Sequence, residues 1–93
     1  MDTKIRNNEE RHRFETSAAG DVAFANYRLD GDRLVLTHTE VPMEAREQGL
    51  ATQLAKFAFE YARTEGLKIV PQCGFMADYA DKHTEYADII AEQ

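Results

Sequence analysis

The sequence predicts an α+β fold with a mixed, largely antiparallel sheet, one main helix and a C-terminal helical segment. Three observations support this class. Residues 12–41 alternate between apolar and polar side chains around a hairpin signal, as antiparallel strands do. Residues 48–65 change to a helical period of about 3.6 residues. A short extended run at residues 67–71 and a second helical pattern at 74–90 complete the chain.

Length and charge restrict the class of protein. Ninety-three residues suffice for one core, so residues 11–93 are predicted to form a single domain, after a polar and flexible N-terminus at residues 1–10. Seventeen acidic and eleven basic residues give a net charge of −6, which disfavours binding to a nucleic-acid backbone. No apolar run approaches the roughly 20 residues that span a bilayer, and the polar start is no signal peptide. We therefore expect a cytoplasmic protein with no nucleic-acid or membrane partner.

Three antiparallel strands are predicted in the first half of the chain, at residues 12–17, 22–29 and 33–41. The Asp30–Asp32 segment, which has glycine at its centre, separates the second strand from the third. Such a segment favours a tight hairpin, because glycine adopts the positive φ that the turn needs. The three strands are therefore expected to form a meander.

The main helix is predicted over residues 48–65, with Gly66 as its C-terminal cap. The strand at 67–71 follows in a β-helix-β unit, so it should pair in parallel with the strand at 33–41. The helical tail is expected to break near Thr84. The apolar face of the main helix is formed by Leu50, Leu54, Phe57 and Tyr61.

A loop of small residues connects the third strand to the main helix, with the pattern Arg46-x-x-Gly49-x-Ala51. Backbone N–H groups at a helix start lack intrahelical partners and converge on an anion such as phosphate. Glycine permits a close approach of the backbone, and a guanidinium would pair with the phosphate. Gln48 and Thr52 would add polar contacts. The alternative is that the arginine is a surface charge beside two glutamates.

The chain has one cysteine, Cys73, which follows the strand at 67–71 and precedes the helical tail. A thiol near a helix N-terminus has its thiolate stabilised by the helix dipole. Two interpretations stay open. Cys73 either takes an acyl group or lines a thioester site, or it is a small buried residue.

Two titratable residues, His38 and Glu40, alternate with Leu34 and Leu36 along the third strand. Strand side chains alternate with a period of two, so all four are expected on one face. A general base just before the phosphate loop would accept a proton from an amine or a thiol. The alternative is that the strand end leaves the core and both side chains are solvated.

Tyr79, Lys82 and His83 are predicted to lie along one side of the tail helix, where they would contact an adenine or a phosphate. The alternative for Tyr79 is a core residue with its hydroxyl at the edge. The single cysteine and the scattered histidines form no metal-ligand spacing, so no metal site is expected.

Several of these motifs occur in one order along the chain. The sequence resembles the short, single-domain GNAT-like N-acetyltransferases, the yjdJ type, over roughly residues 12–90. The resemblance is carried by His38-Thr39-Glu40-Val41-Pro42, Arg46-x-x-Gly49-x-Ala51, Pro71-x-Cys73, Tyr79 and His83-x-Glu85-Tyr86.

The resemblance implies a minimal acetyl-CoA-binding core without the helices that hold an acceptor in larger relatives. The backbone around Val41 to Met43 would pair with the pantetheine arm, and Cys73 would lie near the thioester. Arg46 and the amides of the helix start would hold the pyrophosphate. The sequence departs from the family at Gly74-Phe75, where a Pro/Ser-Tyr pair is common. The implied cofactor-binding residues are Val41, Met43, Arg46, Gln48, Gly49, Leu50, Ala51, Thr52, Tyr79, Lys82 and His83.

The leading function is therefore transfer of acetyl from acetyl-CoA to a primary amine, on a small molecule or a protein. Two mechanisms stay open: direct attack after Glu40 or His38 accepts the amine proton, and an acetyl-Cys73 intermediate. The alternative function is an acyl-CoA-binding, sensing or protein-interaction module without efficient catalysis. A monomer or a weak homodimer is expected.

Overall fold

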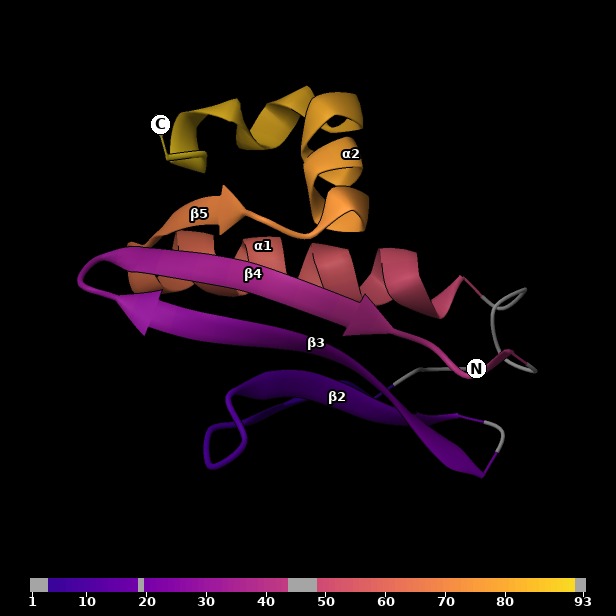
Figure 1. Cartoon of the computed structure of the whole chain (residues 1–93). Coiled ribbons are helices and arrows are strands. Elements are labelled where there is room, and N and C mark those ends of the chain that lie inside the picture. Colours follow the sequence, from indigo (N-terminus) through magenta and orange to yellow (C-terminus); the bar gives the residue numbers. More distant parts are fainter. Residues whose placement is uncertain (1–3, 19, 44–48, 92–93) are drawn as a thin grey trace.

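The computed structural model describes residues 4–18, 20–43 and 49–91 (Figure 1). Within these ranges, five strands form one sheet in the order β1-β2-β3-β4-β5, and the main helix connects β4 to β5. The α+β class with a largely antiparallel sheet is confirmed. The elements are β1 (Arg6–Asn8), β2 (Arg13–Ala18), β3 (Asp21–Asp30), β4 (Arg33–Glu40), α1 (Leu50–Glu65), β5 (Lys68–Pro71), α2 (Gly74–Lys82) and the 3₁₀ helix η2 (Thr84–Ile89).

The predicted strand pairing is confirmed. The β2, β3 and β4 strands form an antiparallel meander, and β5 pairs in parallel with β4, from Arg33↔Lys68 to Leu36↔Pro71. The pairing stops at Pro71, which has no N–H to donate to a ladder. Within the described ranges, none of the helices combines the length and the apolar character that a membrane span requires.

The N-terminal segment differs from the prediction. Residues 6–8 form β1, which pairs antiparallel with β2, whereas a flexible segment was predicted for residues 1–10. Its polar side chains find partners in the sheet, because Arg6 and Asn8 both donate to Glu15, at 2.7 and 3.2 Å. Asn7 accepts a hydrogen bond from the Tyr27 hydroxyl at 2.7 Å. The polar composition of residues 1–10 favoured a mobile segment, because a local pattern does not show that Glu15 and Tyr27 supply partners for these side chains.

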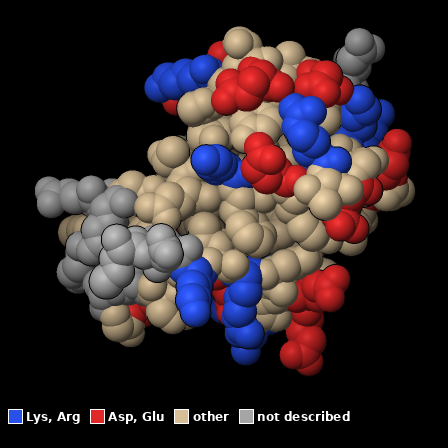
Figure 2. Space-filling model, turned by 180° about the vertical axis from the view of Figure 1, so that it is seen from behind, with Lys and Arg blue, Asp and Glu red and all other residues tan. Residues whose placement is uncertain are grey.

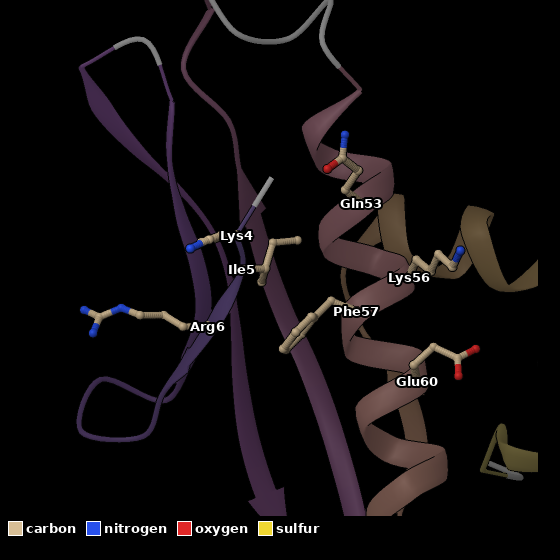
Figure 3. Close-up of a pocket in the computed structure, with 7 residues that line it drawn as sticks. All are labelled: Lys4, Ile5, Arg6, Gln53, Lys56, Phe57 and Glu60. Atoms are coloured by element: carbon tan, nitrogen blue, oxygen red, sulfur yellow. The ribbon is translucent and has the colours of Figure 1, made fainter. Parts of the chain in front are cut away.

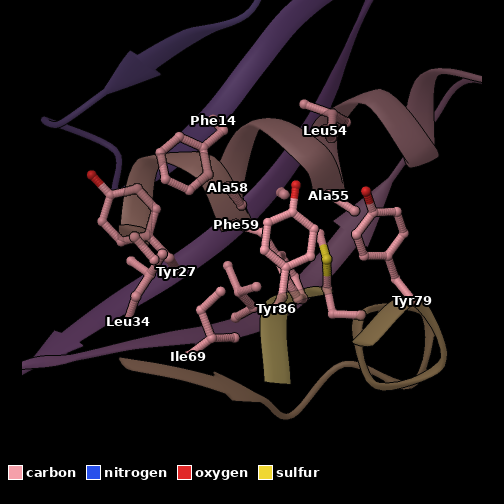
Figure 4. Packing of buried hydrophobic residues seen from close by; sticks show 14 of the residues in the cluster. Phe14, Tyr27, Leu34, Leu54, Ala55, Ala58, Phe59, Ile69, Tyr79 and Tyr86 are labelled. Carbon is pink, nitrogen blue, oxygen red and sulfur yellow. The ribbon is translucent and has the colours of Figure 1, made fainter. Parts of the chain in front are cut away.

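The core lies between α1 and one face of the sheet (Figure 4). Ala55, Ala58 and Ala62 are fully buried on α1, and their small side chains allow the helix to lie close to the strands. Larger side chains fill the remaining space, each stabilising the fold by roughly 1.5–3 kcal/mol relative to exposure. The fully buried large residues are Phe14, Phe59, Leu34, Leu36, Leu54, Ile69 and Met76.

The C-terminal helices pack against α1 rather than against the far side of the sheet. The ring of Phe59 lies 5.1 Å from the rings of both Tyr79 in α2 and Tyr86 in η2. An ion pair of 3.1 Å between Arg63 and Asp88 ties η2 to the last turn of α1. The predicted helical tail and its break near Thr84 are confirmed, since His83 separates α2 from η2. All the helices described therefore lie on one side of the sheet.

A bulge in β4 determines where its polar residues point. Asn26 pairs with His38 and Tyr27 pairs with Leu36, so Thr37 is an extra residue in β4. A bulge of this kind shifts the alternation of side chains by one position. Directly paired residues share a face of an antiparallel sheet, so each β3 partner reports the side on which a β4 residue lies.

The bulge corrects the predicted face of His38 and Glu40. Thr39 pairs with the fully buried Ala25 and so lies on the α1 side, together with Leu36. His38 and Glu40 lie on the opposite face, which no helix of the described chain covers (Figure 1). The prediction that they share a face with Leu34 and Leu36 is therefore wrong. The prediction assumed strict alternation along the strand, and the sequence alone does not show that Thr37 is an extra residue after which the side chains change faces.

Candidate active site

The site is built where β4 and β5 separate. After Pro71, the backbone N–H groups of Gln72 and Cys73 both donate to the carbonyl of Leu36, each at 3.0 Å. The chain then turns into α2 at Gly74. In the part of the chain that the structure describes, β4 has no strand beside it on this side beyond Leu36. The second half of β4 therefore faces an opening with polar backbone along its edge.

A cleft of about 490 Å³ occupies this opening, and we refer to it as the β4 cleft. Its volume lies within the range of small-molecule sites. One wall is the end of β4, and the first turns of α1 and α2 contribute one residue each. The lining residues are His38, Thr39, Glu40, Val41, Ala51 and Phe75.

Four of these six lining residues were predicted as site residues, and Thr39 and Phe75 were not. Both lie next in sequence to residues that the prediction includes or discusses. Thr39 was missed because the bulge, and not the sequence pattern, turns it toward α2. Phe75 was not predicted because the sequence interpretation treated it only as a position without a hydroxyl, whereas its ring lines the cleft.

His38 and Glu40 form a pair at the mouth of the cleft. The Nε2 atom of His38 lies 3.4 Å from Oε1 of Glu40, and their side chains are 57% and 61% exposed. The ring of His38 lies 6.2 Å from the ring of Phe24 on the neighbouring strand. Both side chains are thus solvated, and a substrate can reach both from the uncovered face.

Cys73 is the N-cap residue of α2, as its predicted position near a helix start requires. Its Sγ lies 3.7 Å from Oγ1 of Thr39, which lines the cleft, and the side chain is partly buried against the core. Burial alone would raise the pKa of Cys73. Hydrogen bonds from the backbone of Met76 and Phe75 and from the Thr39 hydroxyl outweigh that effect and lower the pKa of this thiol.

The start of α1 lies on the opposite side of the cleft. Gly49 caps the helix at φ 71°, a left-handed conformation that other residues rarely adopt. Chain neighbours aside, no atom of the described residues lies within 4 Å of the position a Cβ would take. The first-turn N–H groups of Leu50, Ala51 and Thr52 have no acceptor within the helix. No acidic side chain stands in this turn. The geometry therefore fits an anion, with the side chain of Leu50 committed to the core.

The remaining predicted residues fall into two groups. Arg46 and Gln48 lie outside the described residues. Tyr79 is only 7% exposed and packs on Phe59 and His83, which makes it a core residue. Lys82 pairs with Asp78 at 3.0 Å on the surface of α2. The structure therefore does not bring Tyr79, Lys82 and His83 into the lining of the β4 cleft.

Met43 is 74% exposed and borders a second hollow that shares Glu40 and Val41 with the β4 cleft. The structure thus places it beside the site rather than inside the cleft.

No group of three or more His, Cys, Asp or Glu side chains suited to a metal ion occurs among the described residues.

A larger hollow of about 830 Å³, the N-terminal groove, lies between β1 and α1 (Figure 3). No predicted site residue lines the N-terminal groove, so size alone does not identify the site. Seen from behind, the molecule also has a band of uncharged surface, with charged side chains gathered above and below it (Figure 2). The lining residues are Lys4, Ile5, Arg6, Gln53, Lys56, Phe57 and Glu60.

Comparisons with known proteins show the family of the chain. Residues 13–89 match a family model described as GCN5-related N-acetyl-transferase. Protein NATD1 of Mus musculus is 32% identical over 83 residues, which cover 86% of this chain and 76% of that protein. Protein NATD1 of Homo sapiens is also 32% identical over 83 residues, covering 86% of this chain and 74% of its own length.

The fold also matches a solved structure. The solution NMR structure of a GCN5-like protein from Staphylococcus aureus superimposes with a TM-score of 0.76 at 28% sequence identity. The match covers 98% of this chain and 90% of the other. The chain therefore belongs to the GCN5-related N-acetyltransferase family, and acetyl transfer is its class of reaction.

Proposed function

We propose that the protein transfers the acetyl group of acetyl-CoA to a primary amine in the β4 cleft. The observation that carries the proposal is the position of the His38–Glu40 pair at the mouth of a cleft that the N-termini of two helices enclose. A base and the first turn of α1 thus border one opening, and the Cys73 thiol lies behind it, 3.7 Å from the Thr39 hydroxyl. Acyl transfer to an amine uses a base for the ammonium proton and donors that bind the anionic parts of the acyl donor, and a thiol is used only if the acyl group passes through the protein.

The cleft fits the parts of the coenzyme. The first-turn amides of α1 suit the pyrophosphate, and the left-handed Gly49 begins the helix without a side chain that would cover them. Arg46 and Gln48 are proposed as further phosphate contacts. The edge of β4 beyond the bulge suits the amides of the pantetheine arm, which would pair with it as an added strand does. Tyr79, Lys82 and His83 are not included in this proposed site.

In the proposed reaction, Glu40 accepts a proton from the ammonium of the acceptor, directly or through His38. The free amine attacks the thioester carbonyl, a C–N bond forms, and collapse of the tetrahedral intermediate breaks the C–S bond. The nitrogen of the intermediate loses its second proton as the C–S bond breaks, and the leaving thiolate takes up that proton to become CoA-SH. Glu40 then returns its own proton to solvent. Removal of the ammonium proton is required because only the neutral amine has the lone pair that attacks.

An acetyl-Cys73 intermediate is the second candidate mechanism, and the lowered pKa of Cys73 favours it. Intact-protein mass spectrometry after mixing with acetyl-CoA separates the two routes. The covalent route predicts a rapid acetyl adduct that an amine discharges, and loss of turnover in Cys73→Ala. Full turnover in Cys73→Ala without any adduct in the wild type leaves direct attack.

Calorimetry with CoA, acetyl-CoA and ADP tests the proposed binding mode in the wild type and in Gly49→Asp. The aspartate introduces a carboxylate beside the phosphate site and strains a backbone at φ 71°. The affinity is expected to fall by about a hundredfold or more, as for the loss of several charge-assisted hydrogen bonds.

Gly31→Asp is the matched control, because Gly31 also has a positive φ of 62° and open space around it, but lies in the β3–β4 hairpin. It adds the same charge and a similar backbone strain away from the cleft. Equal affinities in the two variants would remove the α1 N-terminus from the proposed site. A cytoplasmic location and a monomer or weak homodimer remain predictions.

A further inference from the structure

A second hollow adjoins the β4 cleft on the uncovered face of the sheet. This sheet-face hollow has a volume of about 450 Å³ and shares Glu40 and Val41 with the β4 cleft. Glu40 therefore stands between the two hollows, with its side chain 61% exposed. The other lining residues of the sheet-face hollow are Arg13, Asp21, Val22, Phe24, Pro42 and Met43.

The wall of this hollow is an aromatic ring held between two neighbours. Phe24 pairs with Glu40 across β3 and β4. The guanidinium carbon of Arg13 lies 4.8 Å from the centre of the Phe24 ring, and the ring of His38 lies 6.2 Å away from it. Arg13 is itself fixed, because its Nε lies 2.6 Å from the Glu15 carboxylate. The ring is thus a positioned apolar surface that ends next to the proposed base.

The charge around the hollow favours a cation. Arg6 and Arg13 both pair with Glu15. Asp21 and Glu40 line the hollow, and among the described residues neither forms an ion pair with a lysine or arginine, although Glu40 lies 3.4 Å from His38. Counted over these five described side chains, two positive and three negative charges leave a net charge of −1. A single ammonium group balances this charge, and the apolar ring beside it suits a hydrocarbon stem rather than a second charge.

We propose that the sheet-face hollow is the acceptor site, and that it takes an alkylammonium group. The nitrogen lies next to Glu40, at the boundary with the β4 cleft, and the methylene stem lies along Phe24 and Val22. This inference rests on the proposed function, since it names the class of acceptor. The same chemistry is presented by a free alkylamine and by a lysine side chain on a protein.

Steady-state kinetics with n-butylamine and with a lysine-containing peptide acetylated at its N-terminus test the proposal. Phe24→Ala is expected to raise the KM for either acceptor by at least about tenfold, because the stem loses apolar contact. Asp21→Asn is expected to raise it by a few-fold and to weaken its dependence on salt. The affinity for acetyl-CoA, measured by calorimetry, should change by less than about twofold in both variants.

Phe57→Ala is the matched control, because Phe57 is also a partly buried ring that lines a hollow, in this case the N-terminal groove. Its acceptor KM should stay at the wild-type value. Phe24→Leu serves if the alanine variant does not fold, with a smaller rise in KM. A wild-type enzyme that transfers acetyl while both Phe24 variants keep the wild-type acceptor KM would overturn the acceptor site and leave the proposed function intact.

Failure of the proposed function has a different outcome, namely no acetyl transfer by the wild type to either acceptor. Amide resonances of the CoA-bound protein, titrated with n-butylammonium, then decide the question of the site. Shifts centred on Val22 and Phe24 support the hollow as an alkylammonium site, whereas shifts elsewhere or no shifts overturn it. In an active enzyme, a higher kcat/KM for the peptide than for n-butylamine identifies a protein-borne lysine as the acceptor, and the reverse identifies a free amine.

Discussion

Phe14 and Glu15 are neighbours in β2, and both are almost excluded from solvent, at 0% and 8% exposure. Phe14 is covered by rings of β3 and α1, with centroid distances of 4.7 Å to Tyr27 and 5.2 Å to Tyr61. Glu15 is covered by the side chains that bind it, chiefly Arg13 at 2.6 Å. One face of the sheet is thus closed by helix packing, and the other is closed locally by ion pairs.

The same contrast continues across the sheet to β4. Leu36, on the covered face, is 1% exposed, whereas Glu40, on the other face, is mostly exposed. Apolar burial stabilises the fold, whereas an exposed carboxylate is available to a substrate. The proposed chemistry therefore depends on a face that contributes little apolar burial, and changes on the two faces should have separable effects on stability and turnover.

The largest change in the free energy of unfolding is expected for Phe14→Ala. The substitution removes a fully buried ring that touches three other aromatic rings, so it leaves a cavity in the core. A loss of about 3–5 kcal/mol is expected, which is a large share of the total stability of a small domain. Urea unfolding followed by circular dichroism measures it.

Phe14→Leu keeps most of the volume and is expected to lose about 1–2 kcal/mol, so it remains folded for comparison. Its turnover per folded molecule should equal that of the wild type. A strong loss of turnover in this folded variant would show that the covered face contributes to the chemistry and would break the contrast.

A smaller change is expected for Glu15→Gln on the uncovered face. The hydrogen bond from Arg13 lowers the pKa of Glu15 most, burial opposes this, and Arg6 and Asn8 lower it further, so that the pKa falls from 4.5 to about 2. Loss of the carboxylate leaves a partly buried arginine without its counter-charge. We expect a loss of about 1–3 kcal/mol at neutral pH.

The pH dependence of this difference follows from the sign of the shift. The pKa of Glu15 in the folded state lies below its ordinary value, so the ion pairs stabilise the fold fully above about pH 4.5. Their contribution fades as the pH falls from 4.5 towards about 2. Urea unfolding at several pH values should therefore show wild type and variant converging in acid. A constant gap down to pH 2 would mean that packing, and not charge, holds Glu15.

Regular periodicity explains which parts of the fold were predictable. The alanine and leucine stripe of α1, the Asp30–Asp32 hairpin and the proline at the end of β5 are local patterns with local physical causes. They sufficed for the meander and the parallel β5. β1 was missed because its stability depends on Glu15 and Tyr27, partners that no short window contains.

The candidate site was predictable in its location and less so in its geometry. Both helix starts, at Gly49 and Cys73, follow from local sequence signals of strand ends and helix caps. The face of His38 and Glu40 did not follow, because one extra residue, Thr37, reverses the alternation. Whether a strand carries a bulge depends on its partner strand and on the twist of the whole sheet.

A still smaller change in stability is expected for Glu40→Gln, and it separates the two faces most directly. The side chain is 61% exposed, so the free energy of unfolding should change by no more than about 0.5 kcal/mol. Removal of the proposed base should lower kcat/KM by about 10²–10⁴-fold. Pre-steady-state kinetics with acetyl-CoA and amine measures the chemical step. A variant that keeps wild-type turnover would move the role of base to His38.

The smallest effect is expected for Thr39→Val, the residue that reaches the cleft from the covered face. Thr39 lies 3.7 Å from the Cys73 sulfur, and its hydroxyl is one of several groups that lower the pKa of the thiol. Without it the pKa of Cys73 should rise, because the thiolate loses a donor while the helix N-terminus remains. The rate of iodoacetamide alkylation at neutral pH should then fall, by less than about tenfold.

Thr37→Val is the control, because the Thr37 hydroxyl contacts the Asn26 carbonyl instead. An equal fall in both variants would assign the effect to β4 backbone changes, and the hydroxyl would have no part in the state of the thiol.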